Sequence, residues 1–139
     1  MEKPEFNFKL AGMEVLQSEI VELKAKHDSS INFYFDISLE MKINQKEEAI
    51  LIAPMVKIRI DEKSEHIGKL KIALVFKIKS FQDYYIPETK NIKLSKDIHN
   101  VLSSISISTL RGVMFNHFKG TYLHNAILPI IDPKSFRIN

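Results

Sequence analysis

The sequence predicts an α+β fold: a four-stranded antiparallel sheet, built as a meander, is followed by one long helix that packs on it. Two observations lead to this prediction. Apolar and polar residues alternate along successive segments before residue 80, which is the period of half-buried strands. Residues 95–119 change to steps of three and four, the period of a helix. No helical pattern separates the strands, and this order is typical of an α+β domain.

The clearest predicted strand is residues 31–43, where every second side chain is apolar. Polar turns lead to a second strand at about 49–61 and a third at about 67–79. Connections this short join antiparallel neighbours. The N-terminal segment also alternates, but its phase breaks at Ala11-Gly12, where a β-bulge would supply the extra residue.

The helix predicted at 95–119 carries apolar residues on two faces. Ser95 is a suitable N-cap, Asp97 places a negative charge in the first turn, and Gly120 suits a left-handed C-cap. A helix that is apolar on two faces must bury both, so we expect one to pack on the sheet and the other on a partner subunit. The residues assigned to this oligomer interface are Ile107, Leu110, Met114 and Phe118.

The chain of 139 residues is expected to form a single domain. Its parts are strands within about 5–79, a loop at 80–94, the helix, and an extended C-terminal segment at 120–139, where two prolines exclude a long helix. The N-terminus lacks the apolar core of a signal peptide, and no apolar run reaches the length of a membrane span. We therefore expect a soluble, cytoplasmic protein.

Composition and motifs argue against most catalytic classes. The chain has no cysteine, which excludes disulfides, thiolate zinc sites and cysteine nucleophiles. Its four glycines are scattered and form no phosphate-binding loop. His117 and His124 flank the end of the helix, and two ordinary histidines are a better interpretation than a metal site. No catalytic residue, metal or cofactor is expected.

A row of basic residues lies on the outward side of the third strand and just beyond it. The net charge of +3 is too mild to indicate nucleic acid by itself. The row also lacks interleaved aromatic residues, which favours a solvated or partner-facing sheet over a nucleic-acid surface. Its members are Lys69, Lys71, Lys77 and Lys79.

Apolar residues also stand where the alternation calls for polar ones. They occur on the otherwise charged face of the second and third strands of the meander, and the loop that follows contains three aromatic residues. This combination is typical of a groove that accepts apolar groups of another molecule, and it is equally typical of a loop that folds over its own sheet. The residues assigned to the groove are Leu51, Met55, Val75, Phe81, Tyr84 and Tyr85.

Three sequence features together resemble the SecB export-chaperone family: Arg111-Gly112 in the helix, the later Leu128-Pro129, and a phase-broken first strand that opens with Phe6. The resemblance implies a non-catalytic holdase that binds unfolded or secretory polypeptides, with the groove as the client-binding site. It also implies a homo-oligomer, a dimer of dimers with the long helices between the dimers. Neither nucleic acid nor membrane insertion is part of this interpretation.

The chain departs from SecB proper in three respects. It is positively charged where SecB is acidic, and its segment between Gly112 and Pro129 is longer. It also lacks the second helix and the cysteines of the zinc-binding tail, so a divergent member without that tail is expected. The alternative function is a specific partner-binding or assembly subunit, for example an antitoxin-guarding chaperone, that uses the same apolar surfaces. A small enzyme or ligand-binding barrel is the third hypothesis.

Overall fold

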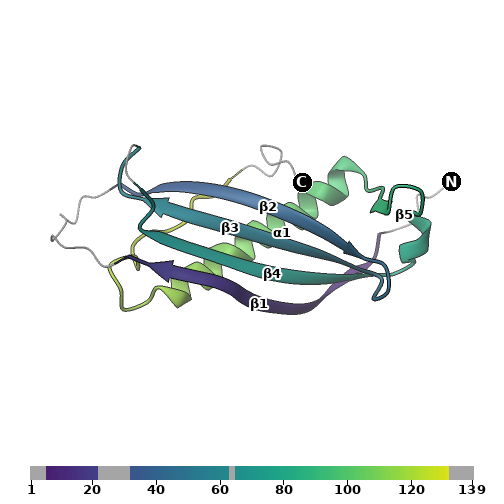
Figure 1. The fold of residues 1–139 in the computed structure, drawn as a ribbon, viewed down its shortest axis with the longest axis horizontal. Helices are drawn as coiled ribbons and strands as arrows, with labels where there is room; N and C mark the ends of the chain where they lie inside the picture. Colours follow the sequence, from purple (N-terminus) through teal and green to yellow (C-terminus); the bar gives the residue numbers. More distant parts are fainter. Residues whose placement is uncertain (1–5, 22–31, 63–64, 132–139) are drawn as a thin grey trace.

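A computed structural model describes residues 6–21, 32–62 and 65–131 of the chain. Four long strands come first, and a short 3-10 turn with a two-stranded ribbon leads to one long helix (Figure 1). In chain order the elements are β1 (Phe8–Ile20), β2 (Tyr34–Asn44), β3 (Ala49–Arg59), β4 (Gly68–Ile78), the 3-10 turn η1 (Phe81–Asp83), β5 (Tyr85–Ile86), β6 (Asn91–Ile92) and α1 (Lys96–His117).

The four long strands form one antiparallel sheet in the order β1-β4-β3-β2. The predicted α+β class is therefore confirmed, and β2, β3 and β4 form the predicted meander. The first strand does not extend this meander beside β2, because it pairs with β4 at the opposite edge. Ile31, the first residue of the predicted second strand in the chain, lies outside the described residues.

Two register shifts interrupt the pairing of β1 with β4. One lies between Leu10 and Gly12, where the sequence predicts a bulge, and the other lies between Val15 and Gln17. Each bulge inserts one residue and so resets which side chains face the helix. Leu10, Met13 and Val15 consequently stand opposite core residues of β4, although they do not share one sequence parity.

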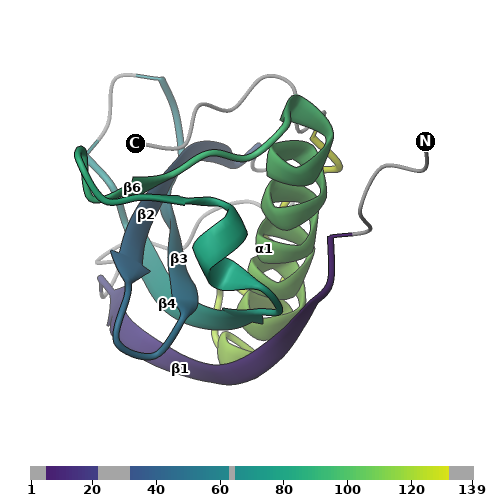
Figure 2. The same cartoon turned by 90° about the vertical axis from the view of Figure 1, so that its right-hand side faces the viewer.

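Helix α1 covers one face of the sheet, which curves around it (Figure 2). Ser95 caps the helix, since its side chain accepts a hydrogen bond from the Ile98 amide at 3.2 Å. The inner face carries two small buried residues, Ser103 and Ser106, which let the helix approach the sheet closely. Fully buried side chains of β3, β4 and α1 fill the space between the layers: Ile50, Ile52, Leu70, Ile72, Leu74, Phe76, Leu102 and Leu110.

The four helix residues expected at an oligomer interface lie instead in the core between α1 and the sheet. They are at most 4% exposed within the single chain and belong to its hydrophobic core. The opposite stripe, which includes Val101 and Phe115, faces outward. Both stripes are apolar, and the one that packs on the sheet is the stripe beside the buried Ser103 and Ser106. The four core residues are Ile107, Leu110, Met114 and Phe118.

The C-terminal segment closes one side of the core. Leu123, Ala126 and Leu128 are buried, and residues 121–131 contain no regular element beyond turns. The Arg111 side chain fixes this segment through hydrogen bonds from Nε to the Leu128 carbonyl (2.8 Å) and from Nη2 to the Pro129 carbonyl (2.7 Å). The rest of the predicted extended segment, 132–139, lies outside the described residues.

Among the residues that the structure describes, no helix combines the length and the apolar character needed to cross a membrane.

Candidate functional site

The sheet itself separates the residues predicted to form one groove. Leu51 and Val75 are register partners on the face turned away from α1, and Met55 lies on the same face of β3. Phe81 is fully buried in the core, and the half-buried side chains of Tyr84 and Tyr85 pack against that core. The predicted six-residue groove does not form, because the loop after β4 returns to the α1 side of the sheet (Figure 2).

Aromatic side chains gather at the end of the sheet where this loop meets β1. Phe6 contacts Phe8 at 5.5 Å between ring centroids and Tyr84 edge-on at 5.2 Å. Phe81 stacks on Tyr85 at 5.4 Å. Contacts of this kind hold the rings in place, while Phe6, Phe8, Tyr84 and Tyr85 all remain partly exposed. This cluster leaves partly exposed apolar surface at one end of β1.

The apolar surface continues along β1 on the α1 side. Leu10, Met13 and Val15 are 47%, 53% and 45% exposed, although they face the same side as the core. They remain exposed because β1 is an edge strand, whereas α1 packs mainly on β3 and β4. We call Phe6, Phe8, Leu10, Met13 and Val15 the β1 strip.

The β1 strip is absent from the sequence-based assignment. The phase break in the sequence marks a bulge but does not show whether the strand lies at an edge or in the centre of the sheet. A central strand would bury these side chains. They are exposed because β1 pairs with β4 on one side and has no strand on its other side in the described sheet.

A second exposed apolar region lies on the outside of α1 and the C-terminal segment. Val101 and Phe115 are about half exposed on the helix, and Phe115 contacts the His124 ring at 4.9 Å. Ile127 is exposed, and Ile130 is 93% exposed on the segment that Arg111 fixes. We call Val101, Phe115, Ile127 and Ile130 the outer surface.

The two histidines near the helix end have separate environments. His117 Nε2 lies 2.5 Å from Ser18 Oγ, which links the end of α1 to β1. His124 packs on Phe115, and its Nδ1 is buried without a hydrogen-bond partner in the described structure. Within residues 6–21, 32–62 and 65–131, no group of three or more His, Asp or Glu side chains could hold a metal ion.

The face of the sheet away from α1, which we call the far face, combines charged and apolar side chains. Glu40 pairs with Lys71 at 3.2 Å and with Lys42 at 3.5 Å. The hydrogen bond from Lys71 and the charge of Lys42 lower the pKa of the Glu40 carboxyl below its ordinary value. Beside these pairs lie the half-buried Leu51 and Val75. The far face is therefore neither uniformly solvated nor covered by any described segment.

Comparison with known proteins identifies a solved structure with a similar fold. No protein-family model matches the sequence, and no curated protein matches it. A SecB-like chaperone from Mycobacterium tuberculosis, crystallised with a peptide of the HigA1 antitoxin, has a similar structure. The TM-score is 0.62 at 8% sequence identity, over 89% of each chain. A protein of unknown function from Streptococcus agalactiae aligns with a TM-score of 0.44 at 13% identity, over 91% of this chain and 98% of that one. The chain has a SecB-like α+β fold.

Proposed function

We propose that this SecB-like chain is a cytoplasmic, non-catalytic holdase that binds unfolded or secretory polypeptides. The observation that carries the proposal is the β1 strip. Three large apolar side chains about half exposed on one edge strand, next to a partly open aromatic cluster, are costly for a solitary domain to leave in water. A client that covers them would recover that cost.

The edge position of β1 supports binding of extended chains. An edge strand presents unpaired backbone groups to which another strand can add, while alternate side chains of the client reach the neighbouring apolar surface. Burial contributes roughly 25 cal/mol per Å² of apolar area regardless of sequence. The unbranched Met13 side chain can adapt to client side chains of different shape, and the partly exposed rings of Phe6 and Tyr84 add apolar surface. Low sequence selectivity is the expected consequence.

The alternative is a chaperone or assembly subunit devoted to one partner. The similar SecB-like chaperone was crystallised with an antitoxin peptide. A dedicated peptide would occupy the same β1 strip, and generic unfolded chains would then bind poorly. Both alternatives include a homo-oligomer, a dimer of dimers. The subunits would meet through the outer surface, because Ile107, Leu110, Met114 and Phe118 are buried in the core of each chain. A solution mass of four chains supports this assembly, and a stable monomer contradicts it.

The two methionines on opposite faces of the sheet provide the test. Met13 lies in the β1 strip and Met55 on the far face. Wild-type protein at equimolar ratio should suppress light scattering by a heat-unfolded enzyme. We expect Met13→Glu to lose most of this suppression and Met55→Glu to retain it, with circular dichroism confirming that both variants fold.

Three outcomes would decide against parts of this proposal. No suppression by wild-type protein would overturn the holdase function. Suppression lost only in Met55→Glu would move the client site to the far face, where the sequence placed half of the groove. Tight binding of a single partner peptide without suppression would favour the dedicated chaperone.

A further inference from the structure

At one end of the far face, carboxylates stand opposite lysines in the register of the sheet, and Asp36 also pairs with Arg59 at 2.7 Å. In register across the sheet, Asp36 of β2 stands opposite Lys57 of β3, Lys57 opposite Lys69 of β4, and Lys69 opposite Glu19 of β1. Each lysine of the central pair therefore has a carboxylate on its other side. Like charges directly opposite each other are destabilising, and this alternation offsets the effect.

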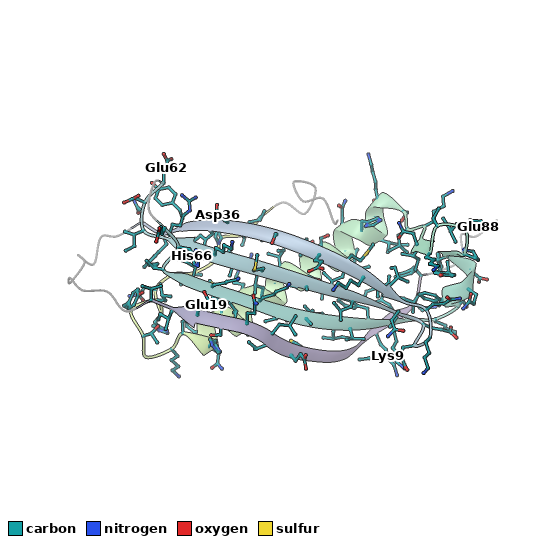
Figure 3. All side chains as sticks on the ribbon, in the orientation of Figure 1. Lys9, Glu19, Asp36, Glu62, His66 and Glu88 are labelled. Atoms are coloured by element: carbon teal, nitrogen blue, oxygen red, sulfur yellow. The ribbon has the colours of Figure 1, made fainter. Side chains whose placement is uncertain are left out.

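The other end of the far face has no such alternation. The corresponding row reads Asn44, Ala49, Lys77 and Lys9, so two lysines are direct neighbours and no acidic residue stands in the row. In the described part of the chain, Glu47 of the β2–β3 turn reaches Lys77 at 3.6 Å. Among the described residues, Lys9 faces Lys77 and no carboxylate in the register of the sheet. Figure 3 shows Lys9 at the opposite end of the sheet from Asp36 and Glu19.

A recess lies at this unbalanced end. It has a volume of about 330 Å³, and Lys79 lines it together with Lys9 and Lys77. The adjoining row reads Lys42, Leu51, Val75 and Gly12, so it is uncharged on β3, β4 and β1 and carries a lysine at β2. A cationic recess thus borders an apolar patch. The residues that line the recess are Asn7, Phe8, Lys9, Lys77, Ile78 and Lys79.

We propose that this part of the far face docks an acidic segment of a protein partner. The carboxylates of the segment lie over Lys9, Lys77 and Lys79, and its apolar side chains lie on the patch beside them. The next row of the sheet carries Glu40 on β2 and Glu14 on β1. These carboxylates would repel a long polyanion that runs across the sheet, whereas a short segment with a few carboxylates would not reach them. Phe8 is the single aromatic residue among those that line the recess and patch, and its ring packs edge-on against Phe76 at 5.8 Å between centroids. One ring that is already packed gives no succession of stacking platforms, which disfavours nucleic acid.

This surface meets the proposed client site at Phe8, which lines the recess and belongs to the β1 strip, whereas Lys9, Lys77 and the apolar patch lie on the opposite face of the sheet from that strip. It also gives a role to the positive net charge of +3. The partner would be steered by charge and held by the apolar patch, so binding should weaken as salt is added.

The test uses a labelled eight-residue peptide of alternating Glu and Leu, with a Gln and Leu peptide as its neutral counterpart, and measures fluorescence anisotropy. We expect the acidic peptide to bind at least about tenfold more tightly than the neutral one at low salt. The double variant Lys9→Gln, Lys79→Gln should lose about tenfold in affinity for the acidic peptide. The matched control, Lys57→Gln with Lys69→Gln, removes the same charge from the row that contains Asp36 and Glu19 and should change affinity by less than about twofold.

Equal affinity for the two peptides, or equal losses in the two double variants, would overturn the proposal. Preferential binding of single-stranded DNA or of vesicles containing an anionic lipid, offered as competitors, would also overturn it. The Lys9→Gln, Lys79→Gln variant should suppress aggregation as the wild type does. This readout keeps the docking surface distinguishable from the holdase proposal, whichever of the two fails.

Discussion

Arg111 joins the two stretches of sequence that carry the family resemblance, and its removal should loosen the C-terminal segment. In the structure its guanidinium donates to the carbonyl oxygens of Leu128 and Pro129 at 2.8 and 2.7 Å. These two bonds hold a segment whose Leu123 and Leu128 side chains are 1% exposed and complete the core. We therefore expect Arg111→Ala to destabilise the whole fold and not only the chain end.

The magnitude follows from the number and exposure of these bonds. A hydrogen bond from a charged donor contributes about 1.5–3 kcal/mol. Arg111 is partly exposed, and the Pro129 carbonyl lies at the surface, where water can replace the lost donor. Discounting each bond to about 1 kcal/mol gives a loss of about 2 kcal/mol in the free energy of unfolding, or roughly 6 °C in Tm.

Urea unfolding followed by circular dichroism, at one fixed protein concentration, measures this loss. Arg111→Lys is the matched control, because it keeps the charge but cannot present two donors in a fork. It should lose about half as much as Arg111→Ala. An Arg111→Ala variant within about 0.5 kcal/mol of the wild type would refute the reasoning, since two such bonds would then contribute nothing net.

Two further predictions concern the helix and the far face. Leu110→Ala should lower the free energy of unfolding by about 3 kcal/mol, because Leu110 is fully buried, whereas Phe115→Ala on the exposed stripe should cost about 1 kcal/mol; equal losses in urea unfolding would contradict the burial described above. Glu40 has a lowered pKa in the folded chain, so the stability it contributes is present above the ordinary carboxyl pKa of 4.5 and is lost as the pH falls through the lower folded value. Between about pH 6 and pH 3 the wild type should therefore lose more stability than Glu40→Gln, and a constant difference between the two would contradict the ion pairs with Lys71 and Lys42.

Alternation along the sequence was enough to assign which side chains of β2, β3 and β4 share a face. Alternation is a local property of the chain, so Ile50, Ile52, Leu74 and Phe76 could be assigned to the core before any strand was placed. The same holds for the cap at Ser95 and for the first bulge, because both depend on neighbours only a few residues away.

The candidate site depended on contacts that are distant in the sequence. Leu51 and Tyr85 were both identified as apolar residues out of place, but periodicity does not show to which side of a sheet a later loop returns. Alternation places Met13 in the first strand but does not assign it to the site, because its exposure follows from the edge position of β1, which the pairing with β4 determines.

The helix shows the same division between local and tertiary information. Periodicity showed that α1 has two apolar stripes, one including Leu110 and the other Phe115, and that both need a surface to cover them. Hydrophobicity does not rank two such stripes. Tertiary packing buried the Leu110 stripe, because the small side chains of Ser103 and Ser106 beside it let the helix approach the sheet closely, whereas the Phe115 stripe remained about half exposed.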